Sequence, residues 1–224
     1  MPNQRKIRVS KVLIFAVILF MLNVTAFSRI YHNHGEEGYE DSGDRHFAGN
    51  TMNFYIIEGA CQFLTGYSDV LLLLNYYEMS DLKGINYDET EQVLDRALNS
   101  LKNTGTTYDS LIALAENTPY NEVFLNKLDS FDYESFRKEN SLNSDIFNEV
   151  ETFLKKGDIT GTFKRSRKIF DLIQGILTSI KESIELEKMP LSDNLWRLNH
   201  TYAVELLFGQ YTAQVYFALK NNNE

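Results

Sequence analysis

The sequence predicts an all-α protein, an antiparallel four-helix bundle with a short-helix insertion between the second and third helices. Residues 52–77 form an apolar stretch with only two charged side chains, Glu58 and Asp69. The chain of 224 residues holds only three prolines, which permits long uninterrupted helices. Four segments of similar length show helical periodicity, and we find no convincing alternation of the kind expected for strands.

Residues 1–28 have the three-part pattern of a secretory signal peptide. An apolar run occupies residues 12–22, and small residues suited to cleavage follow near Ala26 and Ser28. The basic residues that precede the run are Arg5, Lys6, Arg8 and Lys11. We therefore expect an exported protein, periplasmic or secreted. If the segment is not cleaved, it would serve as a signal anchor, and only then would the protein contact a membrane.

The chain is acidic, with a net charge of −9. The leader contributes +4, so the remainder of the chain carries −13. Such a charge argues against nucleic-acid binding, which needs cationic side chains against phosphates. Cys61 is the sole cysteine, so an intrachain disulfide is impossible. Its apolar surroundings predict a small buried hydrophobic residue.

Residues 29–50 are expected to form a flexible linker rich in histidine and acids, ahead of a helical bundle domain at residues 51–224. His32, His34 and His46 are candidate metal ligands, because imidazole and carboxylate groups bind zinc, copper or nickel. However, their spacing matches no standard zinc motif. The simpler interpretation is a solvated leader to the folded domain.

The first helix, from residue 52 to about residue 78, carries one polar stripe. Its members are Glu58, Gln62, Thr65, Asp69 and Tyr76. The preferred interpretation is a solvent-exposed face. A second is a polar track that binds a ligand or ion, for which Arg197 and His200 could supply the facing donors. The candidate ligand-binding residues are therefore Glu58, Gln62, Asp69, Arg197, His200 and Glu205. A third, a transmembrane span, is opposed by the two acids.

The second helix is expected to start at Asp88, where Glu91 completes a capping-box pattern, and to end before Pro119. Residues 119–156 then form the insertion, a crossover or cap with short helices. The last of these, at residues 144–155, is amphipathic, and Gly157 is expected to terminate it.

The third helix, from about residue 160 to 188, has the clearest periodicity in the chain. Isoleucines recur three or four residues apart, at Ile169, Ile173, Ile176, Ile180 and Ile184. Its start is basic, with Lys164, Arg165, Arg167 and Lys168. These four residues are a candidate anion-binding patch, although a solvated face that balances the acidic chain is the simpler interpretation.

The fourth helix is expected from about residue 192 to 220, with Arg197, Thr201 and Glu205 on a polar face. Short connections between the first and second helices, and between the third and fourth, predict two antiparallel hairpins.

We find no motif for a cofactor or for catalysis. The Glu-x-x-His pairs of di-iron bundles, the Cys-x-x-Cys-His of covalent haem and the Gly-x-Ser-x-Gly of hydrolases are all missing from the sequence. No cofactor is indicated, and an enzyme using a pair of carboxylates is a minor hypothesis. The expected function is a non-enzymatic binding or interaction module for a protein partner or a small ligand. The alternative is a metal- or cofactor-carrying helical bundle.

Overall fold

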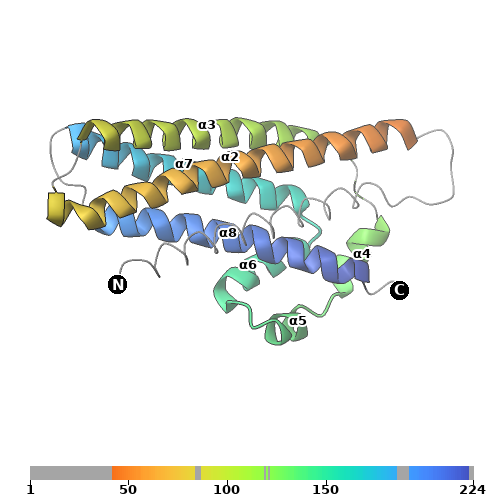
Figure 1. The fold of residues 1–224 in the computed structure, drawn as a ribbon. Helices are drawn as coiled ribbons and strands as arrows, with labels where there is room; N and C mark the ends of the chain where they lie inside the picture. The colour runs from red at the N-terminus through yellow and green to blue at the C-terminus, as the bar shows by residue number, and fades with distance from the viewer. Residues whose placement is uncertain (1–41, 84–86, 119, 121, 186–191, 222–224) are drawn as a thin grey trace. The chain divides into compact units, whose positions relative to one another are not determined.

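The structure is a computed structural model that describes residues 42–83, 87–118, 120, 122–185 and 192–221. Over these ranges every regular element is an α-helix, which confirms the predicted all-α class (Figure 1). The helices are α2 (Ser42–Lys83), α3 (Tyr87–Asn117), α4 (Glu122–Ser130), α5 (Tyr133–Glu139), α6 (Ser144–Leu154), α7 (Ile159–Glu185) and α8 (Ser192–Asn221). No helix in the described ranges has a segment long and apolar enough to cross a membrane.

Helix α2 begins at Ser42, ten residues before the predicted start at Met52. Part of the segment that we expected to be a linker is therefore helical. Extending an existing helix needs no new nucleus. Each glycine costs only about 1 kcal/mol relative to alanine, so Gly43 and Gly49 do not stop the helix.

The chain divides into two compact units. Unit 1 comprises the described parts of residues 1–57, 117–158 and 208–224. Unit 2 comprises those of residues 58–116 and 159–207. Helices α2 and α8 each contribute one segment to each unit. Of α3, only the last residue, Asn117, belongs to unit 1.

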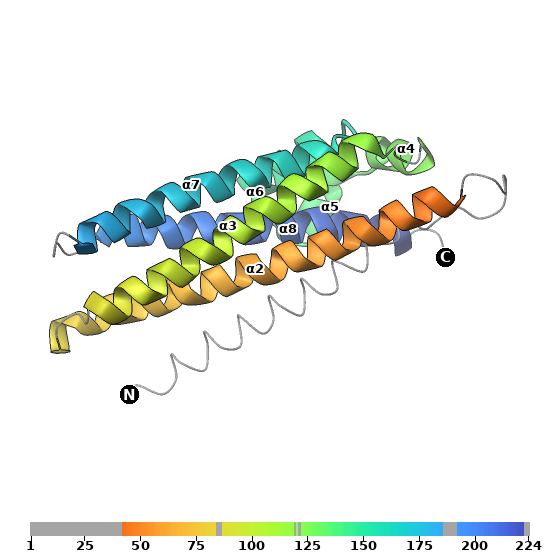
Figure 2. The same ribbon diagram turned by 90° about the horizontal axis from the view of Figure 1, so that it is seen from above.

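The four helices labelled α2, α3, α7 and α8 in Figure 2 all contribute side chains to the apolar core of unit 2. The isoleucine face of α7 lies in this core, as the periodicity predicts, and Ile173 is fully buried. Other core side chains are Val70 and Leu73 of α2, Leu94, Ala97 and Leu101 of α3, and Leu195 and Leu198 of α8. Burial in this shared core explains why the side of α2 that carries Val70 and Leu73 is apolar.

Aromatic rings form the centre of that core. The Phe63 ring lies 5.2 Å from that of Phe170 and 4.8 Å from that of Tyr202, and Tyr67 stacks on Tyr202 at 5.1 Å. The hydroxyl of Tyr67 donates to Asn199 Oδ1 at 3.0 Å. In contrast, the Tyr202 hydroxyl is buried and has no hydrogen-bond partner. It lies against Gly66, where an added Cβ would be 3.1 Å from the hydroxyl oxygen.

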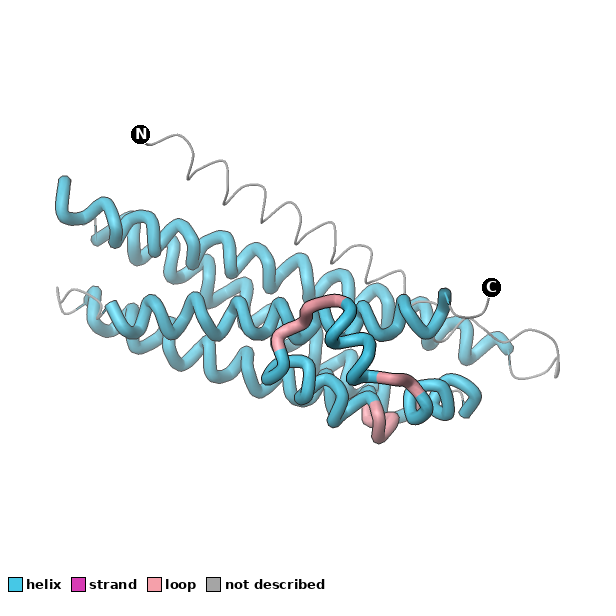
Figure 3. Tube along the Cα trace, turned by 90° about the horizontal axis from the view of Figure 1, so that it is seen from below, coloured by secondary structure: helices cyan, strands magenta, loops and turns pink. Residues whose placement is uncertain are grey.

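Unit 1 contains the short helices α4, α5 and α6, which are joined by loops drawn in Figure 3, and it also contains the final part of α8. Its core includes Phe147, Val150 and Leu154 of α6. The Phe147 ring packs 6.2 Å from Tyr211 of α8, whose hydroxyl accepts from the backbone N–H of Asn143 at 3.2 Å. Short helices need such tertiary support, because they are marginal alone.

The ends of these helices follow the expected local chemistry. The Asn143 side chain accepts from the backbone N–H groups of Asp145 and Ile146, which caps α6. After α6, Gly157 has a φ of +67°, and its N–H donates to Leu154 O at 2.9 Å. The predicted terminating role of Gly157 is therefore confirmed.

We predict opposite effects for two substitutions in the aromatic core. Tyr202→Phe removes a buried hydroxyl without a partner and should raise the free energy of unfolding by about 1 kcal/mol. Tyr67→Phe removes the hydrogen bond to Asn199 and should lower it by about 1 kcal/mol. Urea unfolding followed by circular dichroism measures both. Destabilisation by both substitutions alike would contradict the assignment of the Tyr202 hydroxyl as unsatisfied.

Candidate functional site

Two members of the polar stripe of α2, Gln62 and Asp69, contact α3 within unit 2. Thr107 Oγ1 of α3 donates to Gln62 Oε1 at 3.0 Å. Arg96 of α3 donates to Asp69 Oδ1 at 3.1 Å from Nη2, and the Asp69 side chain is only 14% exposed. Thr65 is exposed, as the preferred interpretation of a solvent-exposed face predicts, whereas Gln62 and Asp69 are only partly exposed and bind α3. The amphipathic pattern alone could not tell water from a facing polar helix.

The remaining candidates of the ligand-binding set do not gather around this stripe. Gln62 Nε2 donates to Glu58 within α2 at 3.4 Å. Arg197 and His200 are exposed on α8. The donors that meet the stripe are Arg96 and Thr107, which the sequence did not single out. The contacts of Arg96 and Thr107 hold α2 to α3 and engage Asp69 and Gln62, two of the candidate ligand-binding residues.

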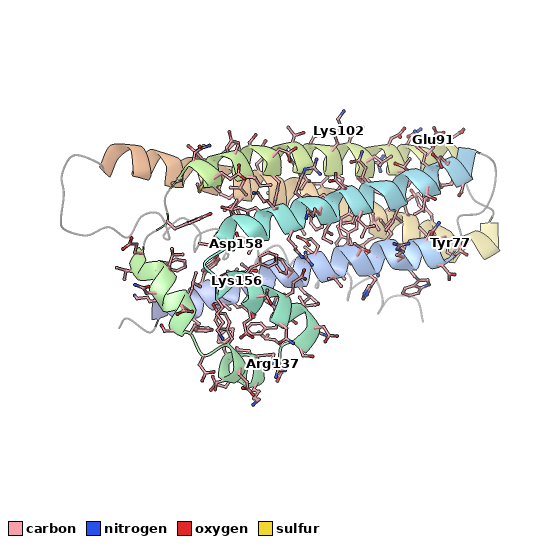
Figure 4. The ribbon with its side chains drawn as sticks, turned by 180° about the vertical axis from the view of Figure 1, so that it is seen from behind. Tyr77, Glu91, Lys102, Arg137, Lys156 and Asp158 are labelled. Atoms are coloured by element: carbon pink, nitrogen blue, oxygen red, sulfur yellow. The ribbon has the colours of Figure 1, made fainter. Side chains whose placement is uncertain are left out.

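The basic start of α7 pairs with the acidic helix α3. Lys164 pairs with Glu116 at 2.6 Å and Arg167 with Asp109 at 2.9 Å, and farther along α7 Lys181 pairs with Asp95 at 2.6 Å. Lys181 also lies 3.7 Å from Glu91, near the start of α3 (Figure 4). Because carboxylates of this chain already compensate most of the patch, it is poorly suited to bind an external anion. Exposed pairs of this kind contribute roughly 0.2–1 kcal/mol each.

Arg165 of the same patch has a different role, because it forms a buried ion pair with Glu205 of α8. The two side chains are 11% and 6% exposed. Tyr108 of α3 lies close by, with its ring 4.8 Å edge-on from Phe170. Burial, and to a lesser extent the charge of Glu205, raise the pKa of Tyr108 above its usual value. The structure thus pairs Arg165, a candidate of the anion-binding patch, with Glu205, a candidate of the ligand-binding set.

Close approach of α2 to this cluster depends on a glycine. A Cβ added at Gly59 would lie 2.8 Å from the Tyr108 ring. Each charge of the Arg165–Glu205 pair compensates the other, and both side chains are largely shielded from solvent. Chemically, this cluster is suited to holding α7 to α8 rather than to recognising an external charge.

The described part of the chain adds no candidate metal ligands to the three histidines named from the sequence. His32 and His34 lie outside the described residues, and His46 belongs to α2, with its side chain outside them. Among the described side chains, no group of three His, Cys, Asp or Glu residues is placed to hold a metal ion. Cys61 is exposed on α2, so our expectation of a buried cysteine is wrong. It occupies the outer side of a helix whose other side meets the core.

The largest opening that we describe is a groove in unit 1, with a volume of about 600 Å³. It lies between α4, α5 and the end of α8, and it is open to solvent on one side. Its lining residues are Lys127, Ser130, Phe131, Asp132, Ser135, Phe136, Glu139, Asn140, Ala218 and Leu219. The sequence placed these residues in a cap or crossover but did not indicate a groove, because α8 joins α4 and α5 only in the folded chain.

The groove combines an apolar lining with ionised groups. Phe131 and Phe136 pack against each other, with ring centroids 5.3 Å apart. The Asp132 carboxylate accepts from the backbone N–H of Ser135 at 3.0 Å and caps α5. This hydrogen bonding lowers the pKa of Asp132, so the side chain remains charged at neutral pH.

By comparison, an apolar cavity of about 20 Å³ in unit 2, beside Tyr77 (Figure 4), has room for about one water molecule.

Comparison of the chain with protein-family models, with curated proteins and with solved structures yields no match in any of the three.

We predict that breaking the buried ion pair from one side is strongly destabilising. Arg165→Met leaves the Glu205 carboxylate buried without its partner and should cost about 3–5 kcal/mol of stability. The double variant Arg165→Met with Glu205→Leu should cost less than Arg165→Met alone, because it leaves no uncompensated charge. Urea unfolding of both variants tests this.

Lys164→Met is the matched control for this ion-pair experiment. Its partner Glu116 is half exposed, so the loss should stay below about 1 kcal/mol. Equal losses for Arg165→Met and Lys164→Met would contradict the role assigned to the buried pair.

We also predict a loss of stability at alkaline pH. The pKa values of Tyr108, Tyr133 and Tyr202 are raised by burial. The folded state therefore holds protons that the unfolded chain releases above about pH 10. The stabilisation is fully present below that pH and is lost as pH rises further. Each tyrosine adds a slope of up to about 1.4 kcal/mol per pH unit.

Urea unfolding between about pH 8 and pH 11 measures this dependence. Lysines also titrate in this range, so the informative quantity is the difference between the wild type and Tyr108→Phe. The variant should lose stability less steeply with pH. Parallel curves would contradict the raised pKa of Tyr108.

Proposed function

We propose that this protein is an exported, non-enzymatic binding module that recognises a protein partner through the groove of unit 1. Export is supported by the sequence pattern of residues 1–28, in which a basic leader precedes an apolar run and small residues. The single observation that carries the binding proposal is the groove of about 600 Å³, with its Phe131, Phe136 and Leu219 lining.

A protein partner fits this groove better than a small ligand does. Small-molecule sites are concave and cover most of the surface of the bound molecule. The groove lies open on one side, and its lining mixes apolar and polar side chains. Those features resemble the surfaces on which one segment of a partner places an apolar anchor and keeps its other side in water.

The frame that we propose for unit 2 is an antiparallel four-helix bundle. Its support is the order of the ion pairs between α3 and α7: Lys164, Arg167 and Lys181 have partners at Glu116, Asp109 and Asp95. As residue numbers increase along α7, the residue numbers of the partners on α3 decrease, as they do between antiparallel helices. The shared core of α2, α3, α7 and α8 is the second support.

Native mass spectrometry of the protein purified from its own source tests this function. We expect a mass for a chain that begins near residue 27 or 29, together with a complex that contains a partner protein. Ser135→Trp, which fills the groove with an indole ring, should reduce that complex at least about tenfold, because a filled pocket excludes the anchoring side chain. Full-length mass would instead indicate a membrane anchor.

Ser179→Trp is the matched control, because Ser179 is exposed on α7 in unit 2. It should leave the complex unchanged. If both variants retain the complex equally, the groove is not the binding site. Extra mass from a metal or small molecule on an otherwise bare chain would favour the alternative of a cofactor-carrying bundle.

A further inference from the structure

The groove of unit 1 has apolar and charged parts that together select a class of partner. The apolar part is made by Phe131, Phe136 and Leu219, and Leu219 is 8% exposed. The Phe136 ring is backed by Phe147 of the unit 1 core, 6.0 Å away. This packing keeps the ring in place, so that a partner meets a preorganised surface.

The charged part is mainly anionic. Asp132 and Glu139 line the groove, and both side chains reach solvent. Lys127 is the cation among the lining residues. The neighbouring Lys138 is paired with Glu134 on α5 at 2.6 Å, so its charge is compensated there. Around the groove, residues 117–158 hold nine acidic and five basic side chains. An electrostatic field of this sign attracts cationic groups.

Hydrogen bonding maintains the charge of Asp132. Its carboxylate caps α5 and accepts from Ser135, which favours the ionised form. The negative charge of Asp132 is therefore a consequence of the local fold of α5 and is present at neutral pH.

Resting on the function proposed above, we infer that the groove binds a cationic peptide segment of a protein partner, with one apolar side chain placed on Phe131, Phe136 and Leu219. Lysine or arginine residues that flank this anchor bind Asp132 and Glu139. Charge complementarity identifies the partner class, and the apolar lining supplies the anchor site.

Fluorescence anisotropy with three labelled octapeptides tests this inference. Each peptide has a central Leu-Phe pair, flanked by lysines in the first, serines in the second and glutamates in the third. We expect the lysine peptide to bind the mature protein most tightly and the glutamate peptide least tightly. The preference should weaken as salt is added, because surface charges are screened.

The decisive variant is Asp132→Asn with Glu139→Gln. Asparagine keeps the helix-capping ability of position 132, so only the charge is lost. Affinity for the lysine peptide should fall roughly five- to twentyfold, as two partly screened ion pairs imply. The control, Glu122→Gln with Asp145→Asn, removes the same net charge from exposed residues outside the groove lining and should change affinity less than about twofold.

Ser135→Trp separates failure of the inference from failure of the proposed function. If the three peptides bind equally and the filled groove abolishes their binding, the groove is a binding site and the cationic class is wrong. If the control charge variant weakens binding as much as the groove variant, net charge rather than the groove is responsible, and the inference is overturned. If no peptide binds, or if Ser135→Trp changes nothing, both the inference and the groove function are overturned.

Discussion

Burial of the isoleucine face of α7 is the constraint on which the rest of unit 2 depends. Ile173, Ile176, Ile180 and Ile184 recur along one side of a helix of 27 residues, and each is at most 7% exposed. Burying such a side chain contributes about 1.5–3 kcal/mol. A single helix cannot cover its own apolar face, so α2, α3 and α8 must supply complementary faces.

Polar contacts then restrict how those faces can meet. Hydrophobic burial has no direction, and many helix registers would bury similar areas. The ion pairs between α3 and α7 form only in a narrow range of registers, and so do the contacts of Gln62 and Asp69 with α3. The buried Arg165–Glu205 pair adds a strong penalty for any packing of α7 on α8 that separates the two charges.

Unit 1 follows a different principle, because its short helices are defined by caps and aromatic contacts. Asp132 and Asn143 begin α5 and α6, and Gly157 ends α6. Phe147 ties these helices to Tyr211 of α8. The same Asp132 that caps α5 also gives the groove part of its negative charge, so local folding and surface chemistry share one residue.

The sequence by itself determined the helical class, the main elements and the apolar face of α7, because periodicity and capping are local properties. It misplaced the start of α2, since the polar, charged composition of residues 29–50 is typical of a linker, and it misplaced Cys61, since an apolar stretch does not say which side faces the core. Only the tertiary structure decided that Arg165 meets Glu205, that the α2 stripe meets α3, and that α4, α5 and α8 enclose a groove. Each of these joins residues far apart in the chain, and no local pattern records which helices become neighbours.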